Sequence, residues 1–384
     1  MRNVAIIGVG LTKFGQLWEH NIISLAVKAG VLAVRDAGIS QRDIQALYVG
    51  TMSGGLFVNQ EHLASLIADY AGFKNIPSVR VESACASGSL ALRQAYLDVA
   101  SGNSDIVVAG GAEKMTDLST HAVTKTLATA ADTEKESVFG ATFPGLYAMM
   151  AKLHMYKYGT TEEQMARVAV KNHKNAMHNP YAQFHKEFTL SQVLNSPYIA
   201  DPIKLLDSSP ITDGAAAVVL ASEEIAKKLC KKPVWIIGSG HATDHVALHD
   251  RQDITTIKAT KVAARQAYKQ AGLKPEDIDM AEVHDCFTIA ELIAIEDLGF
   301  VEKGKAGKFV EEGNTSLKGR LPVNTSGGLK AKGHPVGATG IAQAVEAVLQ
   351  LRGDAGNRNV NPKTVLIHNV GGSGGSALVH IFKK

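Results

Sequence analysis

The sequence predicts an α/β fold built from two copies of one unit, with a long segment inserted into the first copy. An internal repeat indicates the duplication: the strand-like run Val4–Gly10 returns as Val234–Gly240, and Ala37–Ile44 returns as Ala271–Ile278. In each copy a strand, a helix, a short glycine-containing loop and a second strand follow one another, an alternation that favours parallel or mixed sheets covered by helices. Two copies predict two similar sheets packed around shared helices.

The remaining elements of the first copy follow in the same order. A short strand is expected at Val79–Glu82, a helix from Gly88 to Ala100 and a strand at Asp105–Ala109. The apolar run Ala215–Ala221 predicts a buried strand that closes this half.

The second copy ends with a comparable set of elements. The segment Leu321–Thr325 leads to a helix from about Gly337 to Arg352, whose apolar residues recur at helical spacing. Two final strands, Lys363–Asn369 and Ser376–Phe382, are separated by glycines.

The insertion lies between the last two strands of the first copy and has no counterpart in the second. Its predicted helices are Tyr147–Tyr158 and Glu162–His178. An insertion of this length needs packing of its own and is placed to cover a site. We expect three units: an N-terminal half (residues 1–115 and 212–230), an inserted loop domain (116–211) and a C-terminal half (231–384).

Composition excludes several classes of protein. The chain has 384 residues, of which 45% are hydrophobic, and a net charge of +3. This composition supports a large core and gives no reason to expect disorder, nucleic-acid binding or binding to a membrane surface. The longest apolar run is far too short to cross a bilayer. Three Cys cannot form a disulfide framework in so long a chain, so we expect reduced thiols and a cytoplasmic protein.

Cys85 is the first candidate catalytic residue. It lies in Ser83–Ser89, after a short predicted strand and directly before a predicted helix. Backbone N–H groups and the helix dipole at such a position are expected to lower the pKa of a thiol and favour the thiolate. Small neighbouring residues leave room for an acyl group. The alternative is a small buried apolar residue, the usual role of a lone Cys, but the position favours a nucleophile.

His334 is the second candidate. Gly333, Pro335 and Gly337 hold its loop tightly before the predicted helix. An imidazole there can deprotonate a thiol and later donate a hydrogen bond to an oxyanion. A structural His that caps the helix is the alternative, and the residue alone leaves both readings open.

His284 and Cys286 follow the predicted strand Met280–Val283. Open α/β sheets bind ligands at this end of their strands. The two residues are two apart, so on an extended chain they face the same side. Cys286 is therefore a candidate acid/base for proton transfer at carbon.

No metal site is predicted. The chain contains neither CxxC nor HExxH. His241, His245 and His249 recur every four residues near Asp244 and Asp250, a pattern more typical of a polar loop than of a ligand set.

Two glycine-rich segments lack the motifs that they superficially match. Position 13 is Lys13, so Gly8-x-Gly10 has no third glycine and is no dinucleotide fingerprint. The segment Gly371–Gly375 matches GxSxG, but it lies between two predicted strands and is no nucleophile elbow. Glycines in such a turn suit a backbone N–H aimed at an oxyanion.

Taken together in chain order, these segments resemble the thiolases. The matching segments are Ser83–Gly88, Gly110–Met115, Asp213–Ala217, His284–Phe287, Gly333–Pro335 and Gly371–Gly372. The resemblance covers essentially the whole chain. It implies the thiolase fold, a duplicated five-layered α-β-α-β-α architecture with an inserted loop domain.

Two departures narrow the resemblance. Many thiolases carry Asn-Glu-Ala-Phe where this chain has His284–Phe287, and a second catalytic Cys where this chain has Asn369. The sequence is in this respect similar to sterol-carrier-protein-type and archaeal-type thiolases, in which the Cys of the His-Asp-Cys-Phe motif is the acid/base. The chain ends at Lys384 without a sterol-carrier domain, which favours similarity to archaeal-type acetoacetyl-CoA thiolases, acetyl-CoA C-acetyltransferases.

The resemblance implies a mechanism. His334 helps to ionise Cys85, which attacks acetyl-CoA and becomes S-acetylated. Cys286 then removes a methyl proton from a second acetyl-CoA, while His334 and a water held by His284 stabilise the enolate. The enolate attacks acetyl-Cys85, and backbone N–H groups of Cys85 and Gly371 stabilise the tetrahedral oxyanion. The products are acetoacetyl-CoA and CoA. The resemblance implies no metal or redox cofactor.

The resemblance also implies partners and substrate contacts. Family members are homodimers or homotetramers, and the archaeal type acts at the head of the mevalonate pathway, with hydroxymethylglutaryl-CoA synthase and a small acyl-CoA-binding bridging protein. A loop His-Met pair lines the pantetheine in other members, and the matching stretch here is Lys157–Gly159. This makes Lys157 and Tyr158 candidate substrate contacts, although a solvated helix face is the slightly favoured interpretation of the basic residues of this segment.

Two alternatives remain open at this point. The same residues run backwards would cleave longer β-ketoacyl-CoA, and a relict site would make the chain a non-catalytic acyl-CoA-binding subunit of a complex. The presence together of Cys85, Cys286, His284 and His334 argues against a relict. Cys230 has no predicted role.

Overall fold

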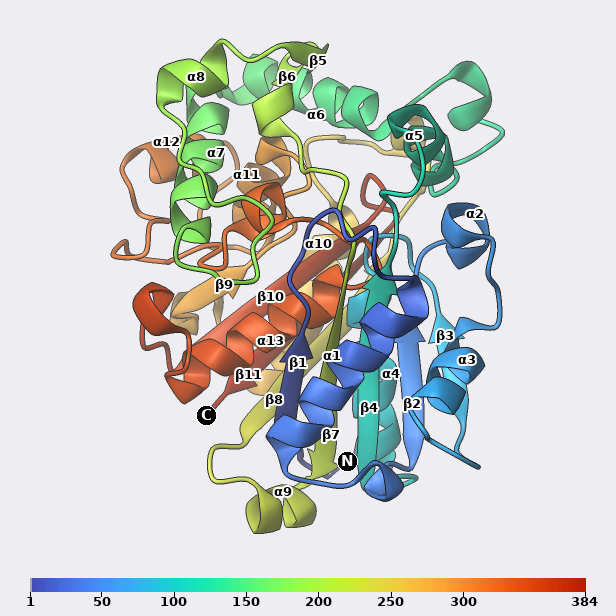
Figure 1. The fold of residues 1–384 in the computed structure, drawn as a ribbon. Helices are drawn as coiled ribbons and strands as arrows, with labels where there is room; N and C mark the ends of the chain where they lie inside the picture. The colour runs from blue at the N-terminus through green and yellow to red at the C-terminus, as the bar shows by residue number, and fades with distance from the viewer. Residues whose placement is uncertain (1) are drawn as a thin grey trace.

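The fold is centred on one mixed sheet of nine strands, and the computed structural model describes residues 2–384 (Figure 1). The strand order is β3-β2-β4-β7-β1-β8-β11-β10-β9, and β5 pairs with β6 apart from this sheet. The strands are β1 (Val4–Leu11), β2 (Ala46–Gly50), β3 (Ser78–Val81), β4 (Ile106–Glu113), β5 (Tyr198–Ala200), β6 (Ile203–Lys204), β7 (Gly214–Ser222), β8 (Val234–Thr243), β9 (Met280–Glu282), β10 (Thr364–Gly371) and β11 (Ser376–Lys383).

The helices cover both faces of the sheet and form nearly half of the inserted segment. They are α1 (Ile22–Ala37), α2 (Gly54–Val58), α3 (Leu63–Tyr70), α4 (Ser87–Ser101), α5 (Thr120–Ala128), α6 (Phe143–Tyr158), α7 (Glu162–Ala176), α8 (Leu190–Leu194), α9 (Glu223–Leu229), α10 (Lys258–Ala271), α11 (Thr288–Asp297), α12 (Ala306–Glu311) and α13 (Thr339–Arg352). A π-helical turn, Gly328–Lys332, precedes α13. Among residues 2–384, no helix combines the length and the apolar character needed to cross a bilayer.

The sheet confirms the duplication. From its centre outward, β1, β7, β4 and β2 of the first copy correspond to β8, β11, β10 and β9 of the second. The two copies meet where β1 pairs antiparallel with β8, with Ala5 opposite Trp235 and Ile6 opposite Val234. The two predicted sheets are therefore joined edge to edge. This pairing occupies backbone groups that two separate edge strands would leave unpaired.

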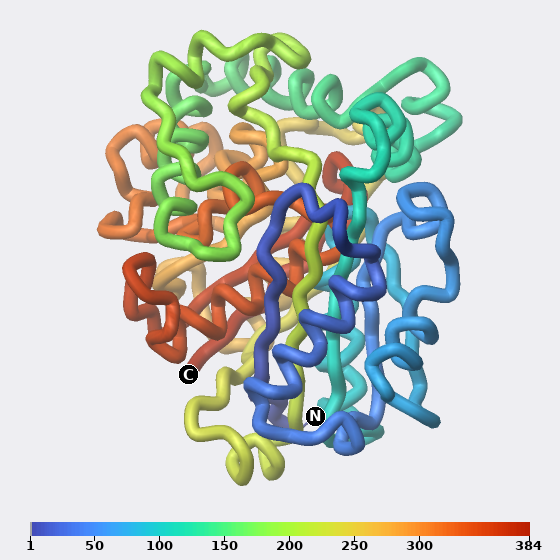
Figure 2. The backbone as a smooth tube through the Cα atoms, viewed as in Figure 1, coloured from blue at the N-terminus to red at the C-terminus, as the bar shows by residue number. Residues whose placement is uncertain are grey.

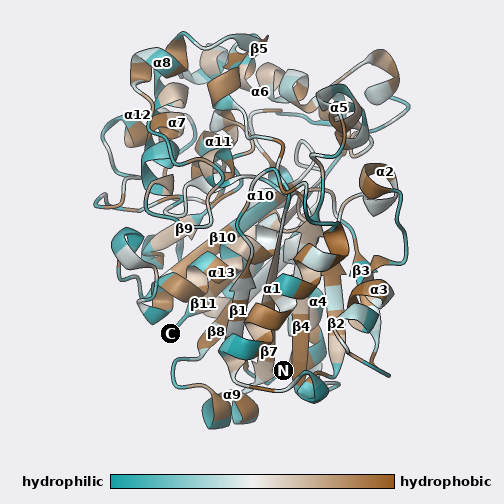
Figure 3. Ribbon diagram, in the orientation of Figure 1, coloured by the Kyte–Doolittle hydropathy of each residue, from teal (hydrophilic) through white to brown (hydrophobic). Residues whose placement is uncertain are grey.

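The layers follow from the alternation of side chains along the strands. On β1, Val4 and Ile6 face the central helices α4 and α13, whereas Ala5 and Ile7 face α1. On the second copy, α10 covers the outer face of β8 and β11. The order is thus helix, sheet, helix, sheet, helix, as the predicted thiolase fold requires, and Figure 3 shows apolar residues along these strands and helices.

Glycines of the repeat bring helix and strand close together. A Cβ at Gly10 would lie 2.1 Å from the carbonyl oxygen of Ala29 in α1, and one at Gly240 would lie 1.9 Å from that of Ala263 in α10. Any side chain at either position would displace the helix. The glycines serve helix–strand packing at equivalent places in the two copies.

The inserted segment packs mainly against the second copy. The helices α6 and α7 both contact α11, and α7 also contacts α12 and the π-helical turn. In Figure 2 this green part of the tube lies above the orange part of the C-terminal half. The two predicted helices exist with shifted ends: α6 begins four residues earlier, at Phe143, and α7 ends at Ala176. The boundaries 116 and 211 of this unit stay our proposal.

Candidate active site

Cys85 lies in a tight turn between β3 and α4. Ser83 is held by a hydrogen bond from its N–H to the Ser87 hydroxyl, and the N–H of Ala86 donates to the Ser83 carbonyl. Ala84 has a φ of 48°, in the left-handed region that costs a non-glycine residue energy. The turn is thus a strained backbone segment that presents the Cys85 thiol at the start of a helix.

His334 is oriented with one ring nitrogen free. Its Nδ1 lies 2.6 Å from the Thr339 hydroxyl, which itself donates to the Pro335 carbonyl at 3.0 Å. The hydroxyl proton is therefore engaged, so Nδ1 of His334 carries a proton and donates it to Thr339. Nε2 is left unprotonated and has no hydrogen-bond partner within residues 2–384. That nitrogen is available as a base.

His284 stands beside His334 with the ring planes nearly perpendicular and the centroids 5.2 Å apart. One ligand-type atom from each of Cys85, His284 and His334 lies within 4.8 Å of the others. Both ring nitrogens of His284 are buried and lack a partner anywhere in the described chain, residues 2–384. The two imidazoles and the thiol thus face one small space.

Burial keeps both imidazoles neutral. It lowers the pKa of His284 to about 3 and that of His334 well below its usual value, and the neighbouring His284 and Lys332 lower the pKa of His334 further. A neutral His334 can accept a proton, whereas a charged one could not.

Burial also acts on the two thiols, and one prediction was wrong here. It raises the pKa of Cys85 to about 12, although the backbone N–H groups of Gly372 and Cys85 act to lower it. It likewise raises the pKa of Cys286 well above its usual value. The helix N-terminus was expected to lower the pKa of Cys85, but removing the thiolate from water outweighs it. Both sulfurs are thiols at rest.

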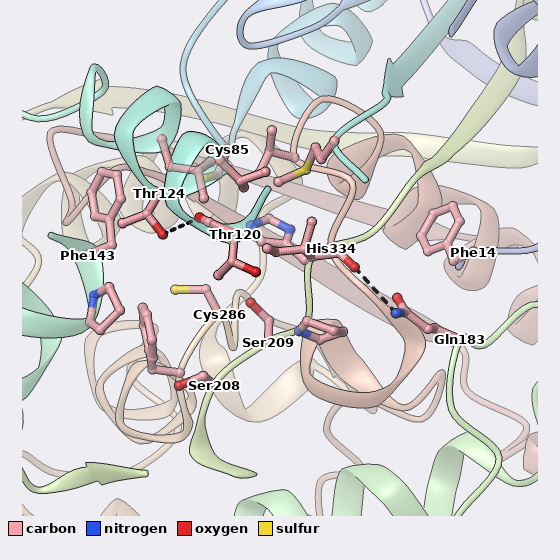
Figure 4. A pocket seen from close by; sticks show the side chains of 18 of the residues that line it. Phe14, Cys85, Thr120, Thr124, Phe143, Gln183, Ser208, Ser209, Cys286 and His334 are labelled. Carbon is pink, nitrogen blue, oxygen red and sulfur yellow. Dashed lines mark hydrogen bonds between the residues drawn. The ribbon is translucent and has the colours of Figure 1, made fainter. Parts of the chain in front are cut away.

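The three predicted groups line one cavity of about 780 Å³ (Figure 4). Cys85, Cys286 and His334 all contribute to its wall, with Gly372 beside them. The inserted segment supplies much of the remaining wall, which is mainly apolar. These residues include Thr120, Val123, Thr124, Leu127, Phe143, Tyr147, Phe184, Ile199 and Leu205.

The glycine turn after β10 places Gly372, and not Gly371, against the nucleophile. Gly372 lines the cavity together with Cys85, and its N–H acts to lower the pKa of the Cys85 thiol. Gly371 is the last residue of β10, and a Cβ on it would lie 2.6 Å from the Ser83 carbonyl oxygen. Gly371 therefore lets the strand approach the Cys85 turn, and the next residue supplies the donor.

Two buried carboxylates hold the loops that carry these groups. Asp285 accepts hydrogen bonds from the N–H groups of Leu329 (2.7 Å) and Lys330 (3.2 Å) in the π-helical turn that leads to His334. Glu113 accepts one from the N–H of Gly337 (3.0 Å), just after His334. Burial raises the pKa of each to about 7. Both residues lay inside motifs noted in the sequence, but nothing there assigned them a role.

Comparison with known proteins agrees with this geometry. A family model described as "Thiolase, N-terminal domain" matches residues 4–224, and one described as "Thiolase C-terminal domain-like" matches residues 240–384. The chain belongs to the thiolase family.

The relatives of this thiolase include two archaeal proteins named "Acetyl-CoA acetyltransferase". The protein from Methanothermobacter thermautotrophicus is 56% identical, with 100% of each chain covered. The protein from Methanocaldococcus jannaschii is 54% identical, with 99% of each chain covered. A solved structure named "Ltp2-ChsH2(DUF35) aldolase" matches with a TM-score of 0.84 and 30% identity, covering 98% of this chain and 97% of that chain.

The structure does not bring Lys157 and Tyr158 to the wall of this cavity, and their contact with substrate stays a prediction. Lys157 forms an ion pair of 3.0 Å with Asp253. The Tyr158 ring packs against His154 and beneath Gly304. Both side chains leave the far end of α6, whereas the start of that helix forms the cavity wall.

Asn369 stands where many thiolases carry their second catalytic Cys, and here its side chain is fully buried. Its Nδ2 donates to Gln343 at 2.7 Å, and its Oδ1 accepts from the Ser89 hydroxyl at 3.2 Å. These bonds tie β10 to the central helices α4 and α13. The Asn369 side chain therefore has a structural role in this thiolase.

No histidine-rich metal site forms at the loop noted in the sequence. The one group of three metal-capable side chains within residues 2–384 is Cys85, His284 and His334, whose ligand atoms lie up to 4.8 Å from one another. Ligand atoms around a zinc ion are roughly 3.5 Å apart, so these side chains would have to move closer together to bind zinc. Cys230 is half-buried, with its Sγ 3.8 Å from the carbonyl oxygen of Ile7. It directly follows α9 and is not among the residues that line the cavity.

Proposed function

We propose that this thiolase condenses two molecules of acetyl-CoA to acetoacetyl-CoA and CoA. The observation that carries the proposal is the meeting of Cys85, Cys286 and the free Nε2 of His334 at one cavity. These are the nucleophile, the acid/base and the activating base that a Claisen condensation through an acyl-enzyme requires. The names of the two archaeal relatives support acetyl-CoA as the substrate.

The first half-reaction acetylates the enzyme. Nε2 of His334 takes the proton of the Cys85 thiol as the sulfur attacks the thioester carbonyl. The C–S bond to CoA breaks, and the departing CoA thiolate takes the proton of Cys286. Acetyl-Cys85, a protonated His334 and a Cys286 thiolate remain. The raised pKa of Cys286 fits this order, because the residue enters the cycle as an acid.

The second half-reaction forms the carbon–carbon bond. The Cys286 thiolate removes a methyl proton from the second acetyl-CoA, and protonated His334 donates a hydrogen bond to the enolate oxygen. A water held by the unpartnered His284 is the second donor in this proposal. The enolate attacks acetyl-Cys85, the C–S bond breaks, and His334 returns its proton to Cys85.

The negatively charged oxygen of the tetrahedral intermediate on Cys85 needs hydrogen-bond donors of its own. The backbone N–H groups of Cys85 and Gly372 both act on the Cys85 sulfur and are placed to stabilise an oxyanion there. Every step is acid–base or acyl-transfer chemistry of Cys and His, so we propose that no metal or redox cofactor takes part.

We place the reaction at the first step of the mevalonate pathway, in the cytoplasm. All three Cys are free thiols, which suits a reducing compartment. We propose a homodimer or homotetramer that works with hydroxymethylglutaryl-CoA synthase and a small acyl-CoA-binding bridging protein. The name of the similar structure, "Ltp2-ChsH2(DUF35) aldolase", gives a precedent for a thiolase-like chain with a second protein.

Mass spectrometry of the intact protein after brief exposure to acetyl-CoA tests the proposal. Wild-type protein should gain one acetyl group on Cys85 and convert acetoacetyl-CoA and CoA to acetyl-CoA, followed by the absorbance of the enolate. Cys85→Ala should lose both, Cys286→Ala should lose turnover, and Cys230→Ala should keep both as the matched thiol control. Full condensation activity in Cys85→Ala or Cys286→Ala would overturn the proposal.

Cleavage of longer β-ketoacyl-CoA is a second candidate, favoured by the size and apolar wall of the cavity. Thiolysis rates measured with acetoacetyl-CoA and with longer substrates separate the two. A preference for longer chains would replace acetoacetyl-CoA as the substrate. Retained CoA binding without any acetylation would instead make the chain a non-catalytic acyl-CoA-binding subunit.

A further inference from the structure

Tyr147 is a buried polar residue of the cavity for which the reaction above has no use. It lies in the second turn of α6 and is only 1% exposed. Its ring packs against Phe287 with the centroids 4.8 Å apart, next to Cys286 in the chain. The inserted segment thus places a phenol beside the acid/base thiol.

The hydroxyl of Tyr147 has two neighbours. It donates a hydrogen bond of 3.1 Å to the carbonyl oxygen of Gly372. The side chain of Cys286 lines the same cavity and is close enough for the two groups to shift each other's pKa. A phenol carries a single proton. While the O–H group donates to the Gly372 carbonyl, the phenol oxygen can act towards Cys286 only as an acceptor of a hydrogen bond from its S–H group. This arrangement fits the thiol form of Cys286 and not the thiolate, which has no proton to give.

We propose that the Tyr147 hydroxyl donates a hydrogen bond to the Cys286 thiolate. The single O–H group then donates to the Gly372 carbonyl while Cys286 is a thiol, and to the Cys286 sulfur while Cys286 is a thiolate. The proposal rests on the proposed function, in which Cys286 gives its proton to CoA and then recovers one from the second acetyl-CoA. Between those events the O–H turns about the phenol C–O bond, and no covalent bond changes. After enolisation the S–H re-forms and the O–H returns to Gly372.

The surroundings keep the phenol in its donor form. Burial and the nearby Cys286 and Cys85 raise the pKa of Tyr147, so the hydroxyl retains its proton at any pH at which the enzyme works. A hydrogen bond from Tyr147 acts to lower the pKa of Cys286, against burial and against Cys85 and Asp285, which raise it.

One further charge faces the pair. The Arg251 guanidinium acts on Tyr147 and also donates to the Ser373 carbonyl at 2.7 Å, which fixes the turn that carries Gly372. Cys85 precedes α4, Asp285 precedes α11 and Arg251 precedes α10. These are the titratable and charged groups that act on the Tyr147–Cys286 pair.

Tyr147→Phe tests the proposal because it removes the hydroxyl and keeps the ring that packs on Phe287. Tyr268→Phe is the matched control. Its hydroxyl also donates to a backbone carbonyl at 3.1 Å, that of Leu298, but it lies in α10 away from the cavity. Exchange of the acetyl-CoA methyl protons with deuterated water, catalysed by the pre-acetylated enzyme, measures enolisation. The rate of Cys286 alkylation at fixed pH, followed at the level of the peptide, reports the fraction of Cys286 that is thiolate.

We expect Tyr147→Phe to lose about tenfold in exchange at neutral pH, and the rate of Cys286 alkylation at any fixed pH between about 7 and 9 to fall about tenfold, as a rise of about one pKa unit requires. Tyr268→Phe should match wild type in both, and equal melting temperatures show that each variant is folded. An unchanged alkylation rate of Cys286 in folded Tyr147→Phe would overturn the inference, even if turnover fell. Exchange that survives in Cys286→Ala would instead overturn the proposed role of Cys286.

Discussion

The ionisation state of Cys85 before substrate binds gives the sharpest test of the site. Burial raises its pKa from 9.0 to about 12, and three units correspond to about 4 kcal/mol against the thiolate. At pH 8 a thiol of pKa 12 is ionised in about one molecule in ten thousand, against about one in ten for a pKa of 9. Cys85 should therefore react with iodoacetamide roughly a thousandfold more slowly than its exposed counterpart would.

The assay is alkylation of the free enzyme between pH 6 and 10, in a Cys230→Ser background, with the Cys85 peptide followed by mass spectrometry. The rate should rise tenfold per pH unit without levelling off, because the thiolate fraction is still small at the upper limit. His334→Ala should leave this profile nearly unchanged and yet slow acetylation by acetyl-CoA by about a hundredfold or more. A plateau below pH 9 that disappears in His334→Ala would refute the reasoning, because it would reveal a thiolate–imidazolium pair at rest.

Three further outcomes follow from the packing and the hydrogen bonds of the site. Asp285→Ala removes the acceptor that holds the π-helical turn before His334, so we expect a loss of about 1–3 kcal/mol in the free energy of unfolding, measured in urea, together with lower turnover. Gly111→Ala should lower the free energy of unfolding by at least about 1–3 kcal/mol, because the new Cβ would lie 2.2 Å from the Gly337 carbonyl oxygen. Gly110→Ala is the control: its Cβ would have its nearest neighbour at 3.6 Å, so this variant should have a melting temperature close to that of wild type. Lys157→Ala should leave the KM for acetyl-CoA within about twofold and the stability within about 1 kcal/mol, because its side chain makes a partly exposed ion pair outside the cavity; a large rise in KM would restore it as a substrate contact.

The layered fold was predictable because its signal is carried along each strand. The repeat of Val4–Gly10 at Val234–Gly240 marks two equivalent strands, and their buried alternation decides which helices they face. The seam between β1 and β8 was not predictable in the same way. The pairing of two edge strands depends on both strands and on how the whole layers stack. No sequence pattern within one strand specifies its partner.

The site was predictable in its residue types and not in its electrostatics. Cys85, His284, Cys286 and His334 stand at strand ends or helix starts, and such places collect reactive groups in α/β folds. The pKa of Cys85 depends instead on burial by chain segments far away in sequence, which outweighs the local helix terminus. For the same reason Tyr147 was not singled out, since its hydrogen-bond partner Gly372 and its neighbour Cys286 are in the other half of the chain.

The equivalence of the two copies has a consequence for how they have diverged. After β9 the second copy presents His284 and Cys286, whereas after β2, its counterpart, the first copy presents Thr51, whose hydroxyl donates to Glu113 at 2.9 Å. Glu113 in turn ends β4 and anchors the loop of the second copy. At these matched strand ends the first copy thus supplies a structural support and the second copy supplies candidate reactive groups, so the two positions are under unlike selection.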